Sequence, residues 1–213
     1  MKRYRLALFD FDGTTFDSKT VAYLAMRYTF EFFGVRIVPT YEQFMSDIDP
    51  GLDFYYRYGV SRSVHPEELN SAFNEGYRIN QDSLSPYEGA EQLLRFCHSN
   101  GMAVGIVSGN TATNIRLGLE RARFGKLVHA MALANGKTTK TEAILRMSAF
   151  FRIPPDRAFY VDDTTSGLLA AKEAGATAIA VTHGFHGERV RSVNPDFVAN
   201  HLDEVTDFLR RRT

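Results

Sequence analysis

Near its N-terminus the chain carries the stretch Leu6-Ala7-Leu8-Phe9-Asp10-Phe11-Asp12-Gly13-Thr14, in which an apolar run meets two acids and a glycine. A short apolar run of this kind is typical of a buried strand in a parallel sheet, and ligands of such sheets sit at the carboxyl ends of the strands. Asp10 and Asp12 would repel each other there unless a cation lay between them, and Mg²⁺ prefers oxygen ligands. Gly13 allows the backbone to turn toward a bound anion. The stretch therefore predicts a magnesium and phosphate site, although Asp-Gly pairs are also common in plain turns.

Similar apolar runs recur along the chain, separated by segments with helical spacing. The expected strands are Arg5–Phe9, Ala103–Val107, Ala158–Val161 and Ala178–Val181, with Val128–Leu133 as a weaker candidate. The expected helices are Gly89–Ser99, Thr111–Arg123, Thr141–Phe151 and Ser166–Ala174. Strands that alternate with helices predict an α/β fold, with a doubly wound parallel sheet that helices cover on both faces.

The region from residue 18 to residue 85 breaks this alternation. It is rich in tyrosine and phenylalanine, shows no convincing strand, and is punctuated by glycine and proline. We expect an α-helical insert whose aromatic side chains mostly form its own core, because aromatic clusters more often serve packing than ligand binding. The predicted domains are an α/β core made of residues 1–17 and 86–213 and a helical domain made of residues 18–85.

Three later segments add polar side chains that parallel topology would bring to the same sheet edge. One strand runs into Ser108-Gly109-Asn110, where the serine hydroxyl can donate a hydrogen bond to a phosphate oxygen. Lys140 opens a helix, a position that opposes the helix dipole and favours a role with an anion, with Lys137 as the rival candidate. Another strand runs into Asp162-Asp163, a second acid pair that calls for a cation. Each segment alone could be a helix cap or a solvated lysine, but together they predict an active site.

Composition limits the partners of the protein. The 213 residues include 25 basic and 25 acidic residues, so charge gives no case for nucleic acid or an anionic membrane as the main partner. The single cysteine, Cys97, excludes an internal disulfide and fits a reducing compartment. No apolar run approaches a membrane span, and the N-terminal run is too short for a signal peptide. We therefore expect a cytoplasmic protein, either a monomer or a homodimer.

With these residues in view, the chain resembles the haloacid dehalogenase superfamily of phosphohydrolases. Asp10-Phe11-Asp12-Gly13-Thr14 looks like the first motif of that superfamily, and Val161-Asp162-Asp163 looks like the fourth in its paired-acid form. Ser108 matches the second motif and Lys140 the third. The resemblance implies a Rossmann-like core, and it places the insert where the superfamily has a helical cap that closes over substrate. This order also resembles the phosphoglycolate-phosphatase-like branch.

The fourth motif departs from the pattern of many relatives. They have a glycine before the motif acid and a second aspartate four residues after it. Here Asp162 stands in place of the glycine, and Gly167 stands in place of the later aspartate. The resemblance therefore leaves open which acids complete the metal site.

The resemblance implies magnesium-dependent hydrolysis of a small phosphorylated metabolite. Asp10 would be the nucleophile and form an aspartyl-phosphate, and Asp12 would protonate the leaving alcohol and then activate water. Mg²⁺ would bind Asp10, the backbone carbonyl of Asp12, and Asp163, with Asp162 as an alternative ligand or a supporting acid. Ser108 and Lys140 would stabilise the phosphoryl charge. The phosphate-binding groups expected in addition are Gly13, Thr14, Gly109 and Asn110.

Several alternatives stay open at this point. A phosphosugar mutase of the same superfamily would share these motifs, and a non-enzymatic phospho-receiver module would use a similar acid pair, hydroxyl and lysine around Mg²⁺. A receiver module has no large helical insert, which disfavours that reading. His183 and His186 could suggest zinc, but no further ligand with suitable spacing accompanies them. Arg57 and the aromatic residues of the insert are candidates for contacting the leaving group and so determining which substrate is bound. Phosphoglycolate, a sugar phosphate and a nucleoside monophosphate all fit as substrates.

Overall fold

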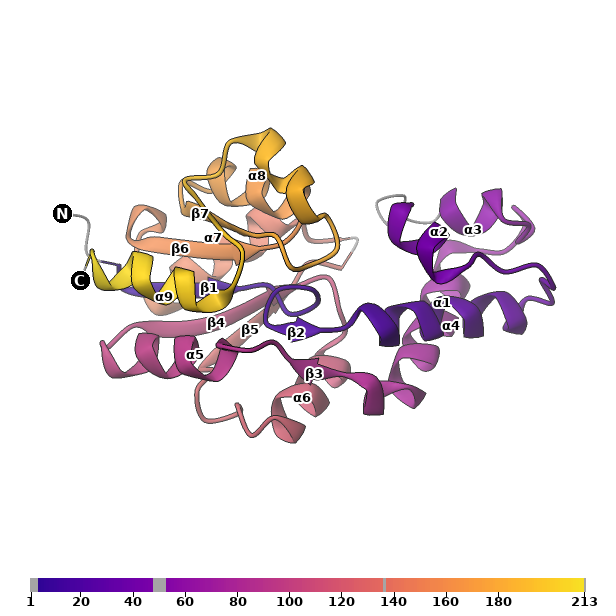
Figure 1. Cartoon of the computed structure of the whole chain (residues 1–213), viewed down its shortest axis with the longest axis horizontal. Helices are drawn as coiled ribbons and strands as arrows, with labels where there is room; N and C mark the ends of the chain where they lie inside the picture. The colour runs from indigo at the N-terminus through magenta and orange to yellow at the C-terminus, as the bar shows by residue number, and fades with distance from the viewer. Residues whose placement is uncertain (1–3, 48–52, 136, 213) are drawn as a thin grey trace. The chain divides into compact units, whose positions relative to one another are not determined.

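A computed structural model of the chain describes residues 4–47, 53–135 and 137–212. The chain forms two compact units (Figure 1). One unit consists of Met1–Asp17 and Ser85–Thr213, and the other consists of Ser18–Leu84. The first is an α/β unit and the second is helical. Their assignment as a catalytic core and a substrate cap is a prediction from the resemblance.

The α/β unit is built around a six-stranded sheet in the order β5-β4-β1-β6-β7-β8, in which all neighbouring strands are parallel. The strands are β1 (Leu6–Phe9), β4 (Ala103–Ser108), β5 (Ala130–Leu133), β6 (Ala158–Asp162), β7 (Thr177–Val181) and β8 (Phe197–Ala199). Every residue of β1, β6 and β7 is buried, which explains why these strands have continuous apolar sequences rather than alternating ones.

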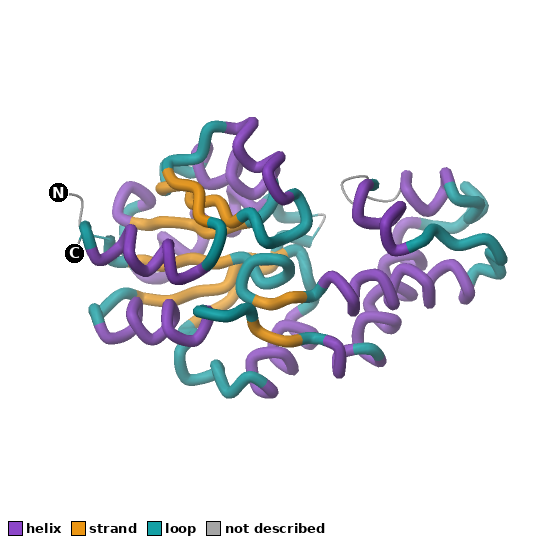
Figure 2. The backbone as a smooth tube through the Cα atoms, in the orientation of Figure 1, coloured by secondary structure: helices purple, strands orange, loops and turns teal. Residues whose placement is uncertain are grey.

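Helices cover both faces of this sheet (Figure 2). They are α5 (Ala90–Ser99), α6 (Ala112–Arg121), α7 (Lys140–Phe151), α8 (Thr165–Glu173) and α9 (Leu202–Arg210). Leu6 and Leu8 of β1 share a buried cluster with Met147 of α7 and Leu168 of α8. The alternate strand residues face the other side of the sheet, where α5 and α9 pack together (Figure 1). The doubly wound α/β fold is thereby confirmed.

A small two-stranded antiparallel sheet lies where the chain leaves and re-enters the α/β unit. It pairs β2 (Phe16–Asp17) with β3 (Ser85–Pro86), and Asp17 lies opposite Ser85. The α/β unit therefore resumes at Ser85, one residue earlier than the predicted core segment. Short 3-10 helices complete the chain at Gln81–Ser83, Pro155–Arg157 and Gly187–Val193.

The helical unit contains α1 (Lys19–Phe32), α2 (Tyr41–Ser46), α3 (Asp53–Arg57) and α4 (Pro66–Ile79), and no strand lies within its described residues. Phe30 packs its ring against Phe54 and Tyr55, and Phe44 contacts Phe54 as well. The prediction of a helical insert with its own aromatic core is confirmed. No helix in the described part of the chain is long and apolar enough to cross a bilayer.

Candidate active site

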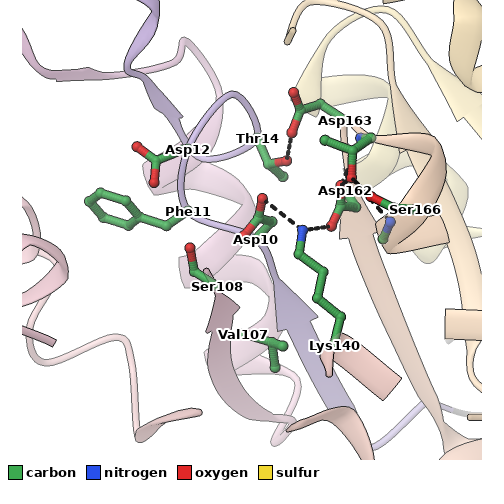
Figure 3. A network of polar contacts seen from close by, with 12 residues as sticks. Asp10, Phe11, Asp12, Thr14, Val107, Ser108, Lys140, Asp162, Asp163 and Ser166 are labelled. Atoms are coloured by element: carbon green, nitrogen blue, oxygen red, sulfur yellow. Dashed lines mark hydrogen bonds and ion pairs between the residues drawn. The ribbon is translucent and has the colours of Figure 1, made fainter. Parts of the chain in front are cut away.

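The polar strand ends meet around β1, in the interior of the sheet. Its last residue, Phe9, lies opposite Ile106 of β4 on one side and Val161 of β6 on the other. The strand order reverses at this point, since the chain continues to β4 and β5 on one side and later to β6, β7 and β8 on the other. Such a switch point is where open α/β sheets bind their ligands. Asp10 and Asp162 therefore emerge from neighbouring strands (Figure 3).

Lys140 joins these two acids. Its Nζ lies 3.2 Å from Oδ2 of Asp10 and 2.6 Å from Oδ2 of Asp162. The lysine is the first residue of α7 because Thr139 caps that helix, accepting a hydrogen bond from the backbone of Glu142. Burial acts to lower the pKa of Lys140, but Asp10 and Asp162 outweigh it and raise the pKa well above its ordinary value. The ammonium group is therefore charged throughout the physiological range.

Asp10, Asp162 and Asp163 form a cluster in which one carboxylate oxygen of each lies within 4.8 Å of the others. Asp10 is 5% exposed, and the other two acids are fully buried. Burial raises the pKa of Asp10 well above its ordinary value; Lys140 opposes this rise, and the neighbouring Asp162 adds to it. Burial and then Asp162 raise the pKa of Asp163 to about 7. If all three carboxylates were ionised, their negative charge would exceed what the Lys140 ammonium balances, and this repulsion adds to the effect of burial on the pKa values of Asp10 and Asp163.

The chemistry of this donor set fits a divalent metal ion. Oδ1 of Asp10 is buried and has no hydrogen-bond partner among the described residues. A buried carboxylate oxygen of this kind is costly unless something pairs with it. Mg²⁺ takes oxygen ligands and offsets the repulsion between neighbouring acids. The cluster is therefore a candidate magnesium site.

Asp163 is held by two donors from distant parts of the chain. The hydroxyl of Thr14 donates to its Oδ1 at 2.9 Å, and the backbone N–H of Phe185 donates to its Oδ2 at 2.7 Å. Gly13 has a φ of +73°, and a Cβ at this position would lie 2.8 Å from Cγ of Asp163. A Cβ on Gly184 would also collide with Asp163. The two glycines therefore let two loops approach this carboxylate closely.

Asp12 lies apart from the acid cluster, and its carboxylate contacts a different partner. The side-chain amide of Asn110 donates to Oδ2 of Asp12 at 2.8 Å. Ser108 is 2% exposed, and its Oγ accepts a hydrogen bond from the backbone of Asn110. The backbone N–H of Gly13 donates to the carbonyl of Phe16 within the tight turn after β1.

These contacts bear on the phosphate-binding predictions. The Gly13 amide and the Asn110 side chain already have partners within the protein, because the turn and the Asp12 carboxylate engage them. The Thr14 hydroxyl and the Lys140 ammonium likewise have partners within the protein. Phosphate binding by all the expected groups stays a prediction; they are Gly13, Thr14, Ser108, Gly109, Asn110 and Lys140.

Of the two candidate lysines, Lys140 and not Lys137 makes the ion pairs with Asp10 and Asp162.

The remaining candidate residues have partners outside the acid cluster. Arg57 lies in the helical unit, where its guanidinium is 3.6 Å from Asp47. His183 and His186 have separate roles. Nε2 of His183 lies 3.1 Å from the carbonyl oxygen of Thr14, and its Nδ1 lies 3.2 Å from that of Asn200. Nδ1 of His186 accepts a hydrogen bond from the backbone N–H of Thr165.

Comparison with known proteins agrees with this architecture. The family model of haloacid dehalogenase-like hydrolases matches residues 7–181. A phosphoglycolate phosphatase of Pseudomonas fluorescens is 22% identical over 93% of this chain and 77% of its own length. A phosphoglycolate phosphatase of Vibrio parahaemolyticus is 25% identical over 95% of each chain.

Solved structures show the same fold. A haloacid dehalogenase-like hydrolase of Streptococcus pneumoniae superposes with a TM-score of 0.85 at 20% identity, covering 98% of this chain and 99% of its own. CbbY of Rhodobacter sphaeroides, solved with phosphate, gives a TM-score of 0.80 at 18% identity, with 95% and 96% covered.

Proposed function

The chain belongs to the haloacid dehalogenase-like hydrolases, and we propose that it is a magnesium-dependent phosphatase that cleaves a small phosphomonoester through an aspartyl-phosphate on Asp10. One observation carries the proposal. The buried carboxylate of Asp10 is paired with Lys140 through Oδ2, while Oδ1 has no partner among the described residues. An acid held in this way at a sheet switch point is suited to act as a nucleophile beside a cation.

Asp10, Asp163 and Asp162 would hold Mg²⁺, together with the backbone carbonyl of Asp12. When bound, the metal ion would neutralise part of the carboxylate charge and of the charge on the phosphoryl oxygens. The Lys140 ammonium lies against Asp10 and would balance charge on the phosphoryl group during transfer. Ser108 is the last residue of the neighbouring strand β4, and its hydroxyl would donate a hydrogen bond to a phosphoryl oxygen.

The reaction would proceed in two steps. A carboxylate oxygen of Asp10 attacks phosphorus, the bond from phosphorus to the ester oxygen breaks, and Asp12 gives its proton to the leaving alcohol. In the second step a water molecule attacks the phosphorus of the aspartyl-phosphate. Asp12 takes a proton from that water, and inorganic phosphate leaves with the Asp10 carboxylate regenerated.

The relatives named phosphoglycolate phosphatase support a small phosphorylated substrate and make phosphoglycolate the first ester to test. Their identity of 22% and 25% supports the class of reaction more than the individual substrate. Sugar phosphates and nucleoside monophosphates belong in the same panel.

The proposal is tested by phosphate release from this panel, with Mg²⁺ or with EDTA, for wild type, Asp10→Asn and Asp156→Asn. Asp156 is an exposed acid in the short helix before β6, so its variant controls for the loss of one carboxylate. We expect magnesium-dependent release by wild type and Asp156→Asn, and loss of release in Asp10→Asn. Equal activity of all three proteins would refute the role of Asp10. Transfer of the phosphoryl group to a sugar, in place of its release, would instead indicate a mutase.

A further inference from the structure

The acid Asp12 and the amide Asn110 lie 98 residues apart in the sequence and are joined by a hydrogen bond. Nδ2 of Asn110 donates to Oδ2 of Asp12 at 2.8 Å. Asp12 follows β1, and Asn110 lies between β4 and α6. A side chain on a loop such as that of Asp12 otherwise rotates among several conformers, so this bond restricts where its carboxylate points.

The Asn110 side chain is itself fixed in orientation. Its Oδ1 accepts hydrogen bonds from the backbone N–H of Thr111 at 2.7 Å and from Nδ2 of Asn114 at 2.9 Å. Two donors on one end of an amide identify that end as the oxygen, and the NH₂ end must then face Asp12.

Asn114 is a rigid support for this arrangement. It is 2% exposed and lies in the first turn of α6. Its backbone N–H donates to the side chain of Thr111, which caps the helix. The side chain of Asn110 is therefore held by residues at the start of α6, whose backbone is fixed by helical hydrogen bonds.

We propose that Asn110, locked by Asn114, is a positioning residue that holds the Asp12 carboxylate in place for proton transfer to the leaving group. The inference rests on the proposed function, in which Asp12 protonates the ester oxygen as its bond to phosphorus breaks. General acid catalysis requires the acid to lie within hydrogen-bond reach of that oxygen, so a freely rotating Asp12 would transfer its proton less often. The phosphate contact that the sequence predicts for Asn110 stays a separate prediction.

Esters with different leaving groups separate this role from a structural one. An alkyl phosphate releases a strongly basic alkoxide unless it is protonated, so its cleavage depends on Asp12. Para-nitrophenyl phosphate releases a stable phenolate, so its cleavage depends little on an acid. A general loss of folding or of phosphate binding would reduce cleavage of both esters equally.

The test compares kcat/KM for one alkyl phosphate and for para-nitrophenyl phosphate in wild type, Asn110→Asp, Asn110→Ala and Asn100→Asp. Asn110→Asp keeps an oxygen for Thr111 and Asn114 but loses the donor to Asp12. Asn100 is exposed and bonds to the carbonyl of Phe96 at the end of α5, so its variant matches the charge change away from the site. Thermal unfolding shows which variants are folded.

We expect both Asn110 variants to lose roughly 10- to 100-fold in kcat/KM on the alkyl ester, which is part of the roughly 10²–10⁴-fold that general acid catalysis supplies, and to change about threefold or less on the aryl ester. Asn100→Asp should match wild type on both. Equal losses on the two esters, or no loss on either, would overturn the inference. If Asn110→Ala does not fold, the near-isosteric Asn110→Asp decides the result.

Failure of the proposed function gives a different outcome. If wild type cleaves neither ester, or if Asp10→Asn is as active as wild type, the phosphatase mechanism is wrong and the role of Asn110 falls with it. If wild type is active through Asp10 and the Asn110 variants do not discriminate between the esters, only the positioning role is overturned.

Discussion

Asp162 and Gly167 exclude each other's side chains, because a Cβ built on Gly167 would lie 2.6 Å from Oδ1 of Asp162 and closer still to its Oδ2. Gly167 belongs to the first turn of α8, and the Asp162 carboxylate lies against that turn, where it accepts two hydrogen bonds from Thr164. The resemblance implies an acid at position 167, whereas the acid at this place comes here from the end of β6. Asp162 and a side chain at position 167 are sterically incompatible, so Asp162 requires the glycine.

The Gly167→Ala variant tests this exclusion. The added methyl group would displace the Asp162 carboxylate and weaken its ion pair with Lys140, so we expect a loss of activity. Overpacking of a buried site also lowers the free energy of unfolding, by about 1–3 kcal/mol. Gly125→Ala is the matched control, since no atom lies within 4 Å of a Cβ there. Steady-state kinetics and urea unfolding of both variants give the comparison, and equal behaviour of the two would contradict the steric account.

Exchanging the residues at positions 162 and 167 tests whether a carboxylate from either position can fill the same space. We expect the double variant Asp162→Gly with Gly167→Asp to be more active than Asp162→Gly alone, because the second substitution returns a carboxylate to the same space. The phosphatase activities of the wild type, the two single variants and the double variant form a double-mutant cycle. Additive losses across this cycle would show that the two positions do not share one role.

Lys140 should be essential where Lys137 is not. Removal of its ammonium group leaves Asp10 and Asp162 without this ion-pair partner. In the proposed mechanism it also removes the charge that balances the phosphoryl group. We expect Lys140→Ala to reduce kcat by about 10²–10³-fold, the effect typical of losing one electrostatic contact to a transition state. Lys137→Ala should stay within about twofold of wild type on the same scale. A large loss in the Lys137 variant and a small one in the Lys140 variant would reverse the assignment.

The buried acids should make the stability of the metal-free protein depend on pH. Burial and Asp162 raise the pKa of Asp163 from 3.8 to about 7, so the folded state binds more protons than the unfolded state between these values. The contribution of this group to the free energy of unfolding is therefore present at pH below 3.8 and is lost as the pH rises toward about 7.

In EDTA we expect the free energy of unfolding of wild type to fall relative to that of Asp163→Asn as the pH rises through this window. Mg²⁺ should stabilise the wild type, since it binds the ionised carboxylates of the folded state. Urea unfolding at several pH values, with and without Mg²⁺, measures both effects. Parallel pH profiles of the two proteins in EDTA would contradict the pKa of Asp163.

Close packing of α1 against α4 depends on Gly76. A Cβ at this position would lie 2.9 Å from Cα of Ala25 and 2.9 Å from Cβ of Tyr28. Backbone atoms cannot move aside as a flexible side chain can, so Gly76→Ala should destabilise the helical unit by about 1–3 kcal/mol despite the better helix propensity of alanine. Thermal unfolding against the Gly125→Ala control measures the effect. An increase in the melting temperature of Gly76→Ala would show that α1 and α4 can move apart without loss of stability.

The strands that position the site could be predicted because they are buried on both faces. In β1, β6 and β7 this burial gives short continuous apolar runs that the sequence shows directly. β5 is harder to predict, because it is an edge strand whose residues are only half-buried. Two elements are not predicted from the sequence: β8, which has only three residues, and α9, whose N-terminus has no side-chain cap.

The site was predictable to the extent that it depends on strand order. Parallel topology alone brings Asp10 and Asp162 to one edge, and the helix start places Lys140 between them. The bonds from Asn110 to Asp12 and from Phe185 to Asp163 depend on side-chain rotamers and loop paths, which residue spacing does not encode. Gly184 was the available signal for the second contact, because a glycine after a strand end permits close backbone approach.

In the proposed mechanism, Asp10 carries the phosphoryl group during turnover. The most direct measurement is to quench the enzyme with acid while it turns over its best ester with Mg²⁺, digest it, and analyse the peptide that contains Asp10 by mass spectrometry. We predict one added phosphoryl group on Asp10, absent from Asp10→Asn and from enzyme quenched without substrate. Turnover with no phosphorylated peptide under these conditions, or a phosphoryl group on a different residue, would show that Asp10 is not the nucleophile.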